Sequence, residues 1–299
     1  MKKFTYKDFM QLLQDNPDGD IKQVFTQQFN DDNVTSKAVL GIDIYRYSKY
    51  DELPRNLLPF VAQILLDSVI ELCIKNEEYL FQKETKDSLK KLFINTGDGG
   101  YFIFDNPLQA IVFAINLEVA VRLFNSSILA PRLRNLVGPA TLRYAMTYDK
   151  VYKYEDNYYG AGIITNARIL SKDKLDRFLV DENVYEWFMQ NTNGIDNLQM
   201  IALDEDIFNL KEFKEYKKIS NSQIFYYEDT KVRNLSNLVG FKSIDVQKIG
   251  ELKIKDDSIS IYNLHIQISN YITIELDTGD MQHKITVSLG NLNVSGISE

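Results

Sequence analysis

The order in which hydrophobic patterns follow one another along the chain is the feature that most constrains its fold. The nearly continuous apolar segment Lys37–Tyr45 predicts a buried strand, and apolar residues at three- and four-residue steps from Leu58 to Leu72 predict a helix with one apolar face. The segments that follow are a hairpin of Lys91–Asn95 and Tyr101–Phe104, a helix from Pro107 to Phe124, a strand pair of Leu142–Tyr148 and Lys150–Tyr154, a helix over Gly160–Leu170, a strand over Phe178–Val180, a helix over Val184–Met189 and a strand over Gln223–Tyr227. This β-α-β-β-α-β order predicts an α+β fold with a ferredoxin-like core rather than a doubly wound nucleotide-binding fold.

The two ends of the chain have patterns of their own. Residues 4–30 predict one or two amphipathic helices, interrupted near Asn16–Gly19. From Ser258 onward apolar residues alternate with polar ones on either side of the turn Asp277–Asp280, which predicts antiparallel strands. We therefore divide the 299 residues into a helical extension (1–35), a central domain (36–229) and a small C-terminal antiparallel β module (230–299). Such a short module has a thin core, so we expect it to pack on the central domain or on a partner chain.

Composition excludes several classes of protein. A single cysteine, Cys73, cannot build a disulfide scaffold, and two histidines cannot build a three-histidine metal site. Any metal would therefore bind carboxylates, as magnesium, manganese and calcium do. The net charge of −8 argues against a general nucleic-acid binder. Neither a leader-like apolar segment nor a run of 18 apolar residues occurs, so we expect a cytoplasmic protein without membrane insertion.

Two acidic residues occupy positions that structure alone does not explain. Asp43 interrupts the buried strand, and Asp98 lies in the turn of the next hairpin between glycines. If the two strands are neighbours, both carboxylates point at one place, where their repulsion would cost from about 1 kcal/mol in water to about 4 kcal/mol at a protein surface. A divalent cation removes that cost, so the pair predicts a metal site.

Five segments, in the expected order, resemble motifs of the class III nucleotide cyclases. Two of them resemble the strand and the hairpin that carry the family's metal-binding acids: Gly41–Ser48 and Asn95–Tyr101. The next strand of the family is matched by Arg143–Val151, and the helix with the transition-state arginine by Tyr159–Ile169. The turn before the family's final strand is matched by Leu210–Phe213. The resemblance spans residues 38–227.

The resemblance implies roles for individual residues. Asp43, Asp98 and the backbone carbonyl of Ile44 would hold two divalent cations, Mn²⁺ or Mg²⁺. Arg168 would stabilise the transition state, and Lys211 is a candidate phosphate ligand. The backbone amides of the turn after the first strand would bind the β- and γ-phosphates of a nucleoside triphosphate; its residues are Tyr45, Arg46, Tyr47 and Ser48. Because the family takes its metals and its arginine from opposite subunits, a homodimer is implied.

Three departures from the family pattern concern the base and the helix. Ile94 and Asn157 stand where a lysine and an acid would read a purine, and Ile164 replaces the usual helix asparagine, with Asn166 out of phase by about 200° of rotation. The chain thus looks most like the bacterial Pycsar pyrimidine cyclases of anti-phage defence, whose product acts on a cyclic-nucleotide-responsive effector. Tyr45 and Tyr50 could fill the space that a purine needs. We expect UTP as the substrate, with CTP or a degenerate, nucleotide-sensing dimer as alternatives.

Overall fold

The computed structural model describes residues 6–15, 17, 34–76, 78–127, 130–154, 157–195, 231–254, 257–276 and 279–297. The predicted strand over Gln223–Tyr227 and the second predicted N-terminal helix lie outside these residues. Within them the helical elements are α1 (Tyr6–Asp15), η1 (Tyr47–Lys49), α3 (Glu52–Asn76), α4 (Glu78–Phe81), α5 (Lys86–Lys91), α6 (Pro107–Asn125), α7 (Pro131–Val137), α8 (Ala161–Lys172) and α9 (Glu182–Thr192). The strands are β1 (Val34–Ile44), β2 (Phe93–Asn95), β3 (Gly99–Phe104), β4 (Leu142–Tyr154), β5 (Asn157–Gly160), β6 (Phe178–Asp181), β7 (Lys231–Ile254), β8 (Asp257–Leu276) and β9 (Gly279–Leu289).

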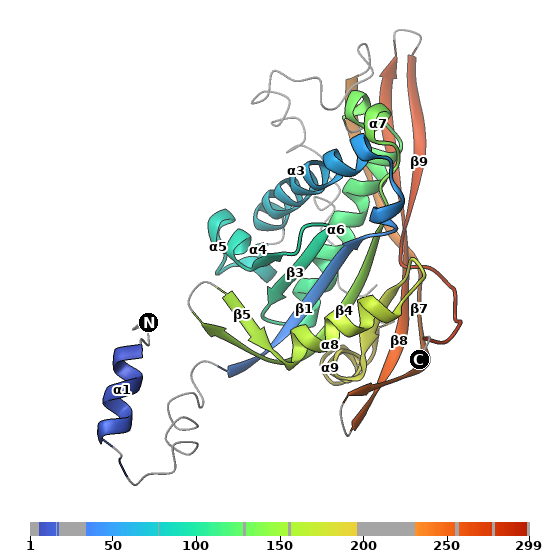
Figure 1. Cartoon of the computed structure of the whole chain (residues 1–299). Helices are drawn as coiled ribbons and strands as arrows, with labels where there is room; N and C mark the ends of the chain where they lie inside the picture. Colours follow the sequence, from blue (N-terminus) through green and yellow to red (C-terminus); the bar gives the residue numbers. More distant parts are fainter. Residues whose placement is uncertain are drawn as a thin grey trace.

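The described strands form one sheet with β1 near its centre (Figure 1). The strand order is β2-β3-β1-β4-β6-β8-β7, with β5 paired to β4 and β9 paired to β8. β1 runs antiparallel to both β3 and β4, while β4 and β6 are parallel. The connection β1-α3-β2-β3-α6-β4 with this strand order is the ferredoxin-like arrangement. The predicted α+β fold class is therefore confirmed.

The two faces of the sheet are covered by different elements. Leu40 and Ile42 of β1 belong to the main hydrophobic core, which also contains residues of α3 and α6. Gly41 faces the other way, because a Cβ added there would lie 2.0 Å from Oδ1 of Asn166 on α8. Side chains alternate along a strand, so Asp43 points to the same side as Gly41. The candidate acid therefore lies on the α8 face of the sheet and not in the main core.

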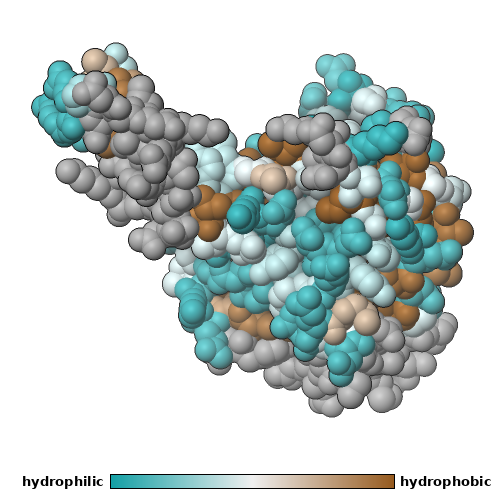
Figure 2. Space-filling view, turned by 90° about the horizontal axis from the view of Figure 1, so that it is seen from below, coloured by the Kyte–Doolittle hydropathy of each residue, from teal (hydrophilic) through white to brown (hydrophobic). Residues whose placement is uncertain are grey.

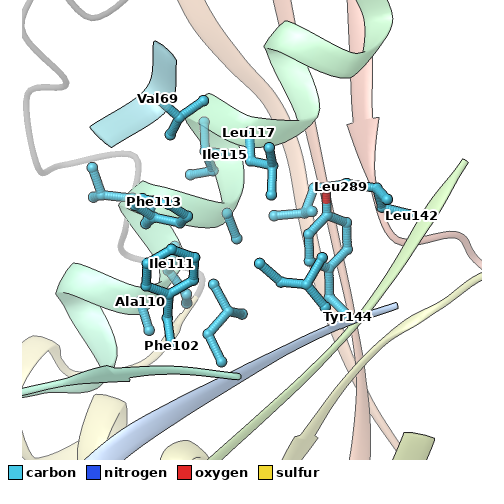
Figure 3. Packing of buried hydrophobic residues seen from close by; sticks show 14 of the residues in the cluster. Val69, Phe102, Ala110, Ile111, Phe113, Ile115, Leu117, Leu142, Tyr144 and Leu289 are labelled. Atoms are coloured by element: carbon cyan, nitrogen blue, oxygen red, sulfur yellow. The ribbon is translucent and has the colours of Figure 1, made fainter. Parts of the chain in front are cut away.

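The main core is dominated by aromatic and branched side chains. The ring centroids of Phe102 on β3 and Phe113 on α6 are 4.5 Å apart, and Figure 3 shows both rings between the sheet and the helix. Leu289 of β9 is buried in the same cluster as Tyr144 of β4. The last strand thus contributes to the core that the central elements build.

Helix α6 begins at a well-formed cap and is buried along most of its length. The side chain of Asn106 accepts a hydrogen bond from the Gln109 amide at 3.0 Å, and Pro107 occupies the first turn, where its missing N–H costs nothing. By length and composition alone, Glu52–Ile74 of α3 and Pro107–Asn125 of α6 could each cross a membrane, and 50% and 83% of their most apolar windows are buried inside the fold. Both helices pack against the sheet as core helices.

The strand β4 and the C-terminal strands differ in how well they match the sequence-based predictions. Residues 142–154 form one strand rather than a pair, because the whole of β1 pairs with them without a break, from Val34 opposite Tyr152 to Ile44 opposite Leu142. The C-terminal strands join the central sheet through pairing of β8 with β6, so this part of the chain packs on the central elements. The hairpin of β8 and β9 projects past the body of the sheet in Figure 1.

Candidate functional site

Asp43 and the turn that carries Asp98 meet at one end of neighbouring strands. Asp43 pairs with Gly99 across β1 and β3, and the Ile44 amide donates a hydrogen bond to the Asp98 carbonyl at 3.0 Å. Gly99 is required for this approach, because a Cβ there would lie 2.0 Å from the Ile42 carbonyl oxygen. The sequence therefore brings the two predicted acids together by strand register and one glycine.

The electrostatics of Asp43 are set by burial and by its neighbours. Burial is the largest influence and raises the pKa of the Asp43 carboxyl above its usual value, the Arg143 guanidinium lowers that pKa, and the Asp98 carboxylate raises it. Asp98, in the turn before β3, thus influences the pKa of Asp43 on β1. The effect of Asp98 on the pKa of Asp43 has the sign expected for repulsion between two acids.

Arg143 forms a direct ion pair with Asp43. The two residues are opposite one another in the pairing of β1 with β4, and Arg143 Nε donates to Asp43 Oδ2 at 2.5 Å. The side chains are about one-fifth exposed, at 20% and 19%. Arg143 Nη1 also donates to the backbone carbonyl of Asp173, just after α8. Arg143 therefore fixes the orientation of the Asp43 carboxylate.

The donor set fits a hard divalent cation. The ion pair with Arg143 uses Oδ2 of Asp43, and the Asp98 carboxylate makes no hydrogen bond or ion pair with the described residues. No group of three or more His, Cys, Asp or Glu side chains occurs in the described ranges. A cation here would therefore bind two carboxylates, a backbone carbonyl, water and substrate oxygens, which is a set that Mg²⁺ uses with phosphate substrates.

The turn after β1 is shaped by hydrogen bonds of its tyrosines. The Tyr45 amide already donates to the Thr141 carbonyl at 2.9 Å, so it is not free for a phosphate, unlike what the sequence suggested for this turn. The Tyr45 hydroxyl donates to the Lys174 carbonyl at 3.2 Å, and the Tyr50 hydroxyl donates to the Pro139 carbonyl at 3.0 Å.

Arg46, Tyr47 and Ser48 form the tip of this turn. Arg46 has a left-handed backbone (φ 57°), and its guanidinium carbon lies 4.9 Å from the ring centroid of Tyr45. Ser48 is exposed, while the Tyr47 hydroxyl donates to the Arg55 carbonyl at 3.0 Å. The amides of a helix's first turn have no acceptor inside the helix, so those at the start of η1 remain the candidate phosphate donors.

Helix α8 presents two different faces. Asn166 is fully buried, and its Nδ2 donates to the carbonyls of Val39 (2.8 Å) and Ala145 (3.0 Å), which fastens the helix to β1 and β4. Ile164 is 55% exposed, and Arg168, one turn later, is half-buried on the same outer side. Asn166 therefore has a structural position, and Arg168 points away from the sheet that carries Asp43.

Of the remaining candidate residues, two lie within the described part of the chain and one lies outside it. Asn157 is exposed at the start of β5, with its Nδ2 3.5 Å from the Tyr159 hydroxyl, while Ile94 is half-buried and packs against the cluster of Val39 and Ile103. Lys211 lies outside the described residues, so its predicted role stays a prediction.

Two residues near the acids were not singled out from the sequence. Tyr101 lies opposite Gly41 on the α8 face, and burial together with Asp43 and Asp98 raises the pKa of its phenol. Arg143 is the other. A signal for Arg143 was available, because it is the one charged residue in the apolar start of its strand, Leu142–Met146, much as Asp43 interrupts an apolar run.

Comparisons with known proteins give similarity at the level of structure only. No family model and no curated protein matches the sequence. The chain is similar to the adenylyl cyclase CyaB from P. aeruginosa, at 10% identity and a TM-score of 0.44, over 77% of this chain and 95% of that one. It is similar to the guanylyl cyclase Cya2, at 12% identity and a TM-score of 0.39, over 78% and 92% of the two chains. It is also similar to the adenylate/guanylate cyclase/hydrolase from Silicibacter pomeroyi, at 14% identity and a TM-score of 0.37, over 77% and 96%. At such identities and TM-scores, this likeness assigns no activity to the chain.

Proposed function

We propose that this protein is a nucleotide cyclase that converts UTP to 3′,5′-cyclic UMP and pyrophosphate. The observation that supports this most strongly is that Asp43 and the Asp98 turn meet at one end of β1 and β3, where the Ile44 amide donates a hydrogen bond to the Asp98 carbonyl. The Asp98 carboxylate raises the pKa of Asp43, so two charged acids here are costly without a cation, and Arg143 is the partner of Asp43 among the described residues. The class III cyclase motifs in the sequence supply the reaction.

The proposed reaction is an in-line displacement at the α-phosphate. The ribose 3′-oxygen forms a bond to the α-phosphorus, the bond from that phosphorus to the bridging oxygen breaks, and pyrophosphate leaves with the electron pair while the hydroxyl proton passes to water. Two bound divalent cations, Mn²⁺ or Mg²⁺, would lower the pKa of the 3′-hydroxyl and neutralise the triphosphate. Asp43, Asp98 and the Ile44 carbonyl would hold them, and Arg168 would stabilise the charge that develops on the phosphate.

The choice of a pyrimidine rests on the absence of the lysine and the acid that read a purine in the cyclases that the sequence resembles. Ile94 has no hydrogen-bonding side chain and packs against Ile103, and Asn157 carries no charge. The rings of Tyr45 and Tyr50 are each held by a hydrogen bond from their hydroxyl to a backbone carbonyl, which suits walls that limit the size of a base. CTP would satisfy the same residues, so it is the alternative substrate.

The proposed enzyme is a homodimer with two sites at its interface. Arg168 and the exposed Ile164 lie on the outer side of α8, away from the sheet, which suits a contribution of Arg168 of the partner subunit to the acids of this one. We further propose that the protein acts in the bacterial cytoplasm as a second-messenger synthase in anti-phage defence, with a cyclic-nucleotide-responsive effector downstream. These proposals rest on the sequence resemblance.

Pyrophosphate release from each of the four nucleoside triphosphates, with Mn²⁺ or Mg²⁺ and identification of the product, tests the activity. We expect turnover of UTP, with loss of at least about a hundredfold in Asp98→Ala, because one carboxylate of a two-acid site is removed. The matched control is Asp105→Ala, which removes an exposed acid that is paired with Lys37 at the far end of β3. If no triphosphate is turned over, the protein is not a cyclase, and a nucleotide-sensing dimer becomes the better explanation.

A mixing experiment tests the shared site. Asp98→Ala and Arg168→Ala chains are each expected to be inactive alone. A mixed dimer contains one interface in which both groups are intact, so partial activity should return. Proven heterodimers without any recovery would contradict the assignment of the acids and the arginine to different subunits.

A further inference from the structure

A continuous series of polar contacts leads from Asp43 to the last described residues of the chain. Its first step is the Arg143 guanidinium, which bridges the Asp43 carboxylate and the Asp173 carbonyl. A guanidinium held at two points has a fixed orientation, because its donors lie in one plane. The position of the loop at Asp173 therefore sets how Arg143 meets Asp43.

The second step is a fully buried ion pair within this loop. Arg177 Nε and Nη2 donate to Oδ1 of Asp173 at 3.0 and 2.7 Å, and the two side chains are only 1% and 2% exposed. Removing one member of such a pair leaves an uncompensated buried charge, so the two residues hold one another in place. The same loop accepts the hydrogen bond of the Tyr45 hydroxyl at the Lys174 carbonyl. One short loop thus supports two groups of the candidate site.

The third step connects the loop to the C-terminal segment, residues 290–297. Arg177 Nη1 donates to the carbonyls of Asn293, at 3.3 Å, and Ser295. Asn291 Nδ2 donates to the Asp176 carbonyl, and Asn263 Nδ2 on β8 donates to the carbonyl of Asn291 at 2.7 Å. A buried arginine must place all its donors, and this one satisfies part of them only while the C-terminal segment is seated.

The C-terminal segment is a surface element despite these contacts. Residues 292–296 are exposed, and Leu292 and Val294 are 61% and 48% exposed. Its other anchor is Ile297, which is partly buried against the cluster of Leu252 and Ile261. Because most of its side chains are exposed, the segment is held chiefly by its hydrogen bonds to Arg177 and Asn263, and it can separate from the fold without opening the main core.

We propose that Arg177 is a positioning residue of the candidate site and that the C-terminal segment controls it. While residues 290–297 are seated, Arg177 holds Asp173, Asp173 holds Arg143, and Arg143 presents Asp43 in one orientation. Release of the segment loosens this series and lowers the rate of the reaction at Asp43. The inference rests on the proposed function for its effect on rate, whereas the mechanical connection itself does not.

Hydrogen exchange of the full-length protein, without metal or nucleotide, tests the connection directly. Arg143→Gln removes the site end of the series, and we expect the peptide that covers residues 290–297 to exchange about fivefold faster, the effect of one net hydrogen bond. The control is Lys90→Gln, which breaks a 2.7 Å ion pair with Asp67 away from the series. Unchanged exchange of this peptide in Arg143→Gln overturns the proposal.

A substitution in the C-terminal segment tests whether this segment affects turnover at the candidate site. Asn291→Ala removes the hydrogen bond from Nδ2 to the Asp176 carbonyl and the one that Oδ1 accepts from the Asn293 amide. The control Asn191→Ala on α9 removes a hydrogen bond from Nδ2 to the Trp187 carbonyl. We expect kcat to fall about fivefold in Asn291→Ala only, with KM for the nucleotide held within about twofold and equal thermal midpoints in both variants. Equal kcat in the two variants of an active enzyme also overturns the proposal. If the wild-type protein turns over no nucleotide, the cyclase assignment fails alone, and hydrogen exchange still decides the connection.

Discussion

Glu118 on α6 gives a sharp prediction for the pH dependence of stability. Its carboxyl is 3% exposed, Oε2 accepts a hydrogen bond from the Tyr144 hydroxyl at 3.0 Å, and Arg122 Nε lies 2.8 Å from Oε1. Burial raises the pKa of Glu118 from its ordinary 4.5 to about 7, against the lowering effect of Arg122. Between about pH 4.5 and pH 7, Glu118 therefore keeps in the folded protein a proton that it has lost in the unfolded chain.

This difference in bound protons decides whether stability rises or falls with pH. Where the folded state binds more protons than the unfolded state, the free energy of unfolding falls as pH rises. The decrease begins near the unfolded pKa of 4.5 and is complete above the folded pKa of about 7. Between about pH 5 and pH 8 it amounts to about 2–3 kcal/mol, since one pKa unit corresponds to about 1.4 kcal/mol. Glu118→Gln keeps the shape of the side chain and removes its titration.

Chemical denaturation at these two pH values measures the effect. The wild-type protein should lose about 2–3 kcal/mol more than Glu118→Gln does on going from about pH 5 to pH 8. Asp181, whose pKa burial raises to about 8, has the same sign but is present in both proteins, so it cancels in the comparison. Glu186→Gln, which changes an exposed glutamate on α9, serves as the control. Equal losses in the wild type and Glu118→Gln would show that Glu118 is ionised in the folded state.

Three further substitutions test the packing around the site. Asn166→Ala leaves two buried carbonyls of β1 and β4 without their donor, so we expect a loss of about 2 kcal/mol in urea denaturation, with a smaller loss contradicting the role of Asn166 as a clamp. Gly99→Ala forces a Cβ against the Ile42 carbonyl, and we expect about 1–3 kcal/mol lower stability and loss of nucleotide turnover; full activity would contradict the close approach of β3 to β1. Phe102→Ala should cost about 3–5 kcal/mol in the same denaturation assay, and a cost below about 1 kcal/mol would show that the core refills the space.

Much of the fold could be predicted because the relevant signals are local. The glycine-flanked turn at Asp98 and the proline at the start of α6 are recognised from a few neighbouring residues, and the structure has these elements. The out-of-phase position of Asn166 also follows from helix geometry, and the structure uses that residue to hold α8 on the sheet. The incorrect split of β4 arose because Asp149 and Lys150 look like turn residues, whereas pairing with the long β1 keeps them in a strand.

The parts of the site that sequence reasoning missed depend on contacts between distant segments. Arg143 meets Asp43 because of strand register, and Arg177 reaches the carbonyls of Asn293 and Ser295 because β8 brings the chain end back to β6. No pattern within a window of the sequence encodes either contact. The acceptors of both Arg177 hydrogen bonds are backbone carbonyls, which every residue type carries, so residue identity does not reveal them.

The pairing of β6 with β8 has a consequence for how the protein is made. Phe178 of β6 pairs with Leu264 of β8, which leaves the ribosome on the order of ten seconds later at typical rates of synthesis. During that interval β6 is an open edge of the nascent sheet, able to pair with other extended chains. A shortened chain that ends before β8 would keep this edge permanently. Expression of residues 1–229 alone is therefore expected to give aggregates, and chaperones that shield strand edges would matter most for this protein while its last seventy or so residues are being translated.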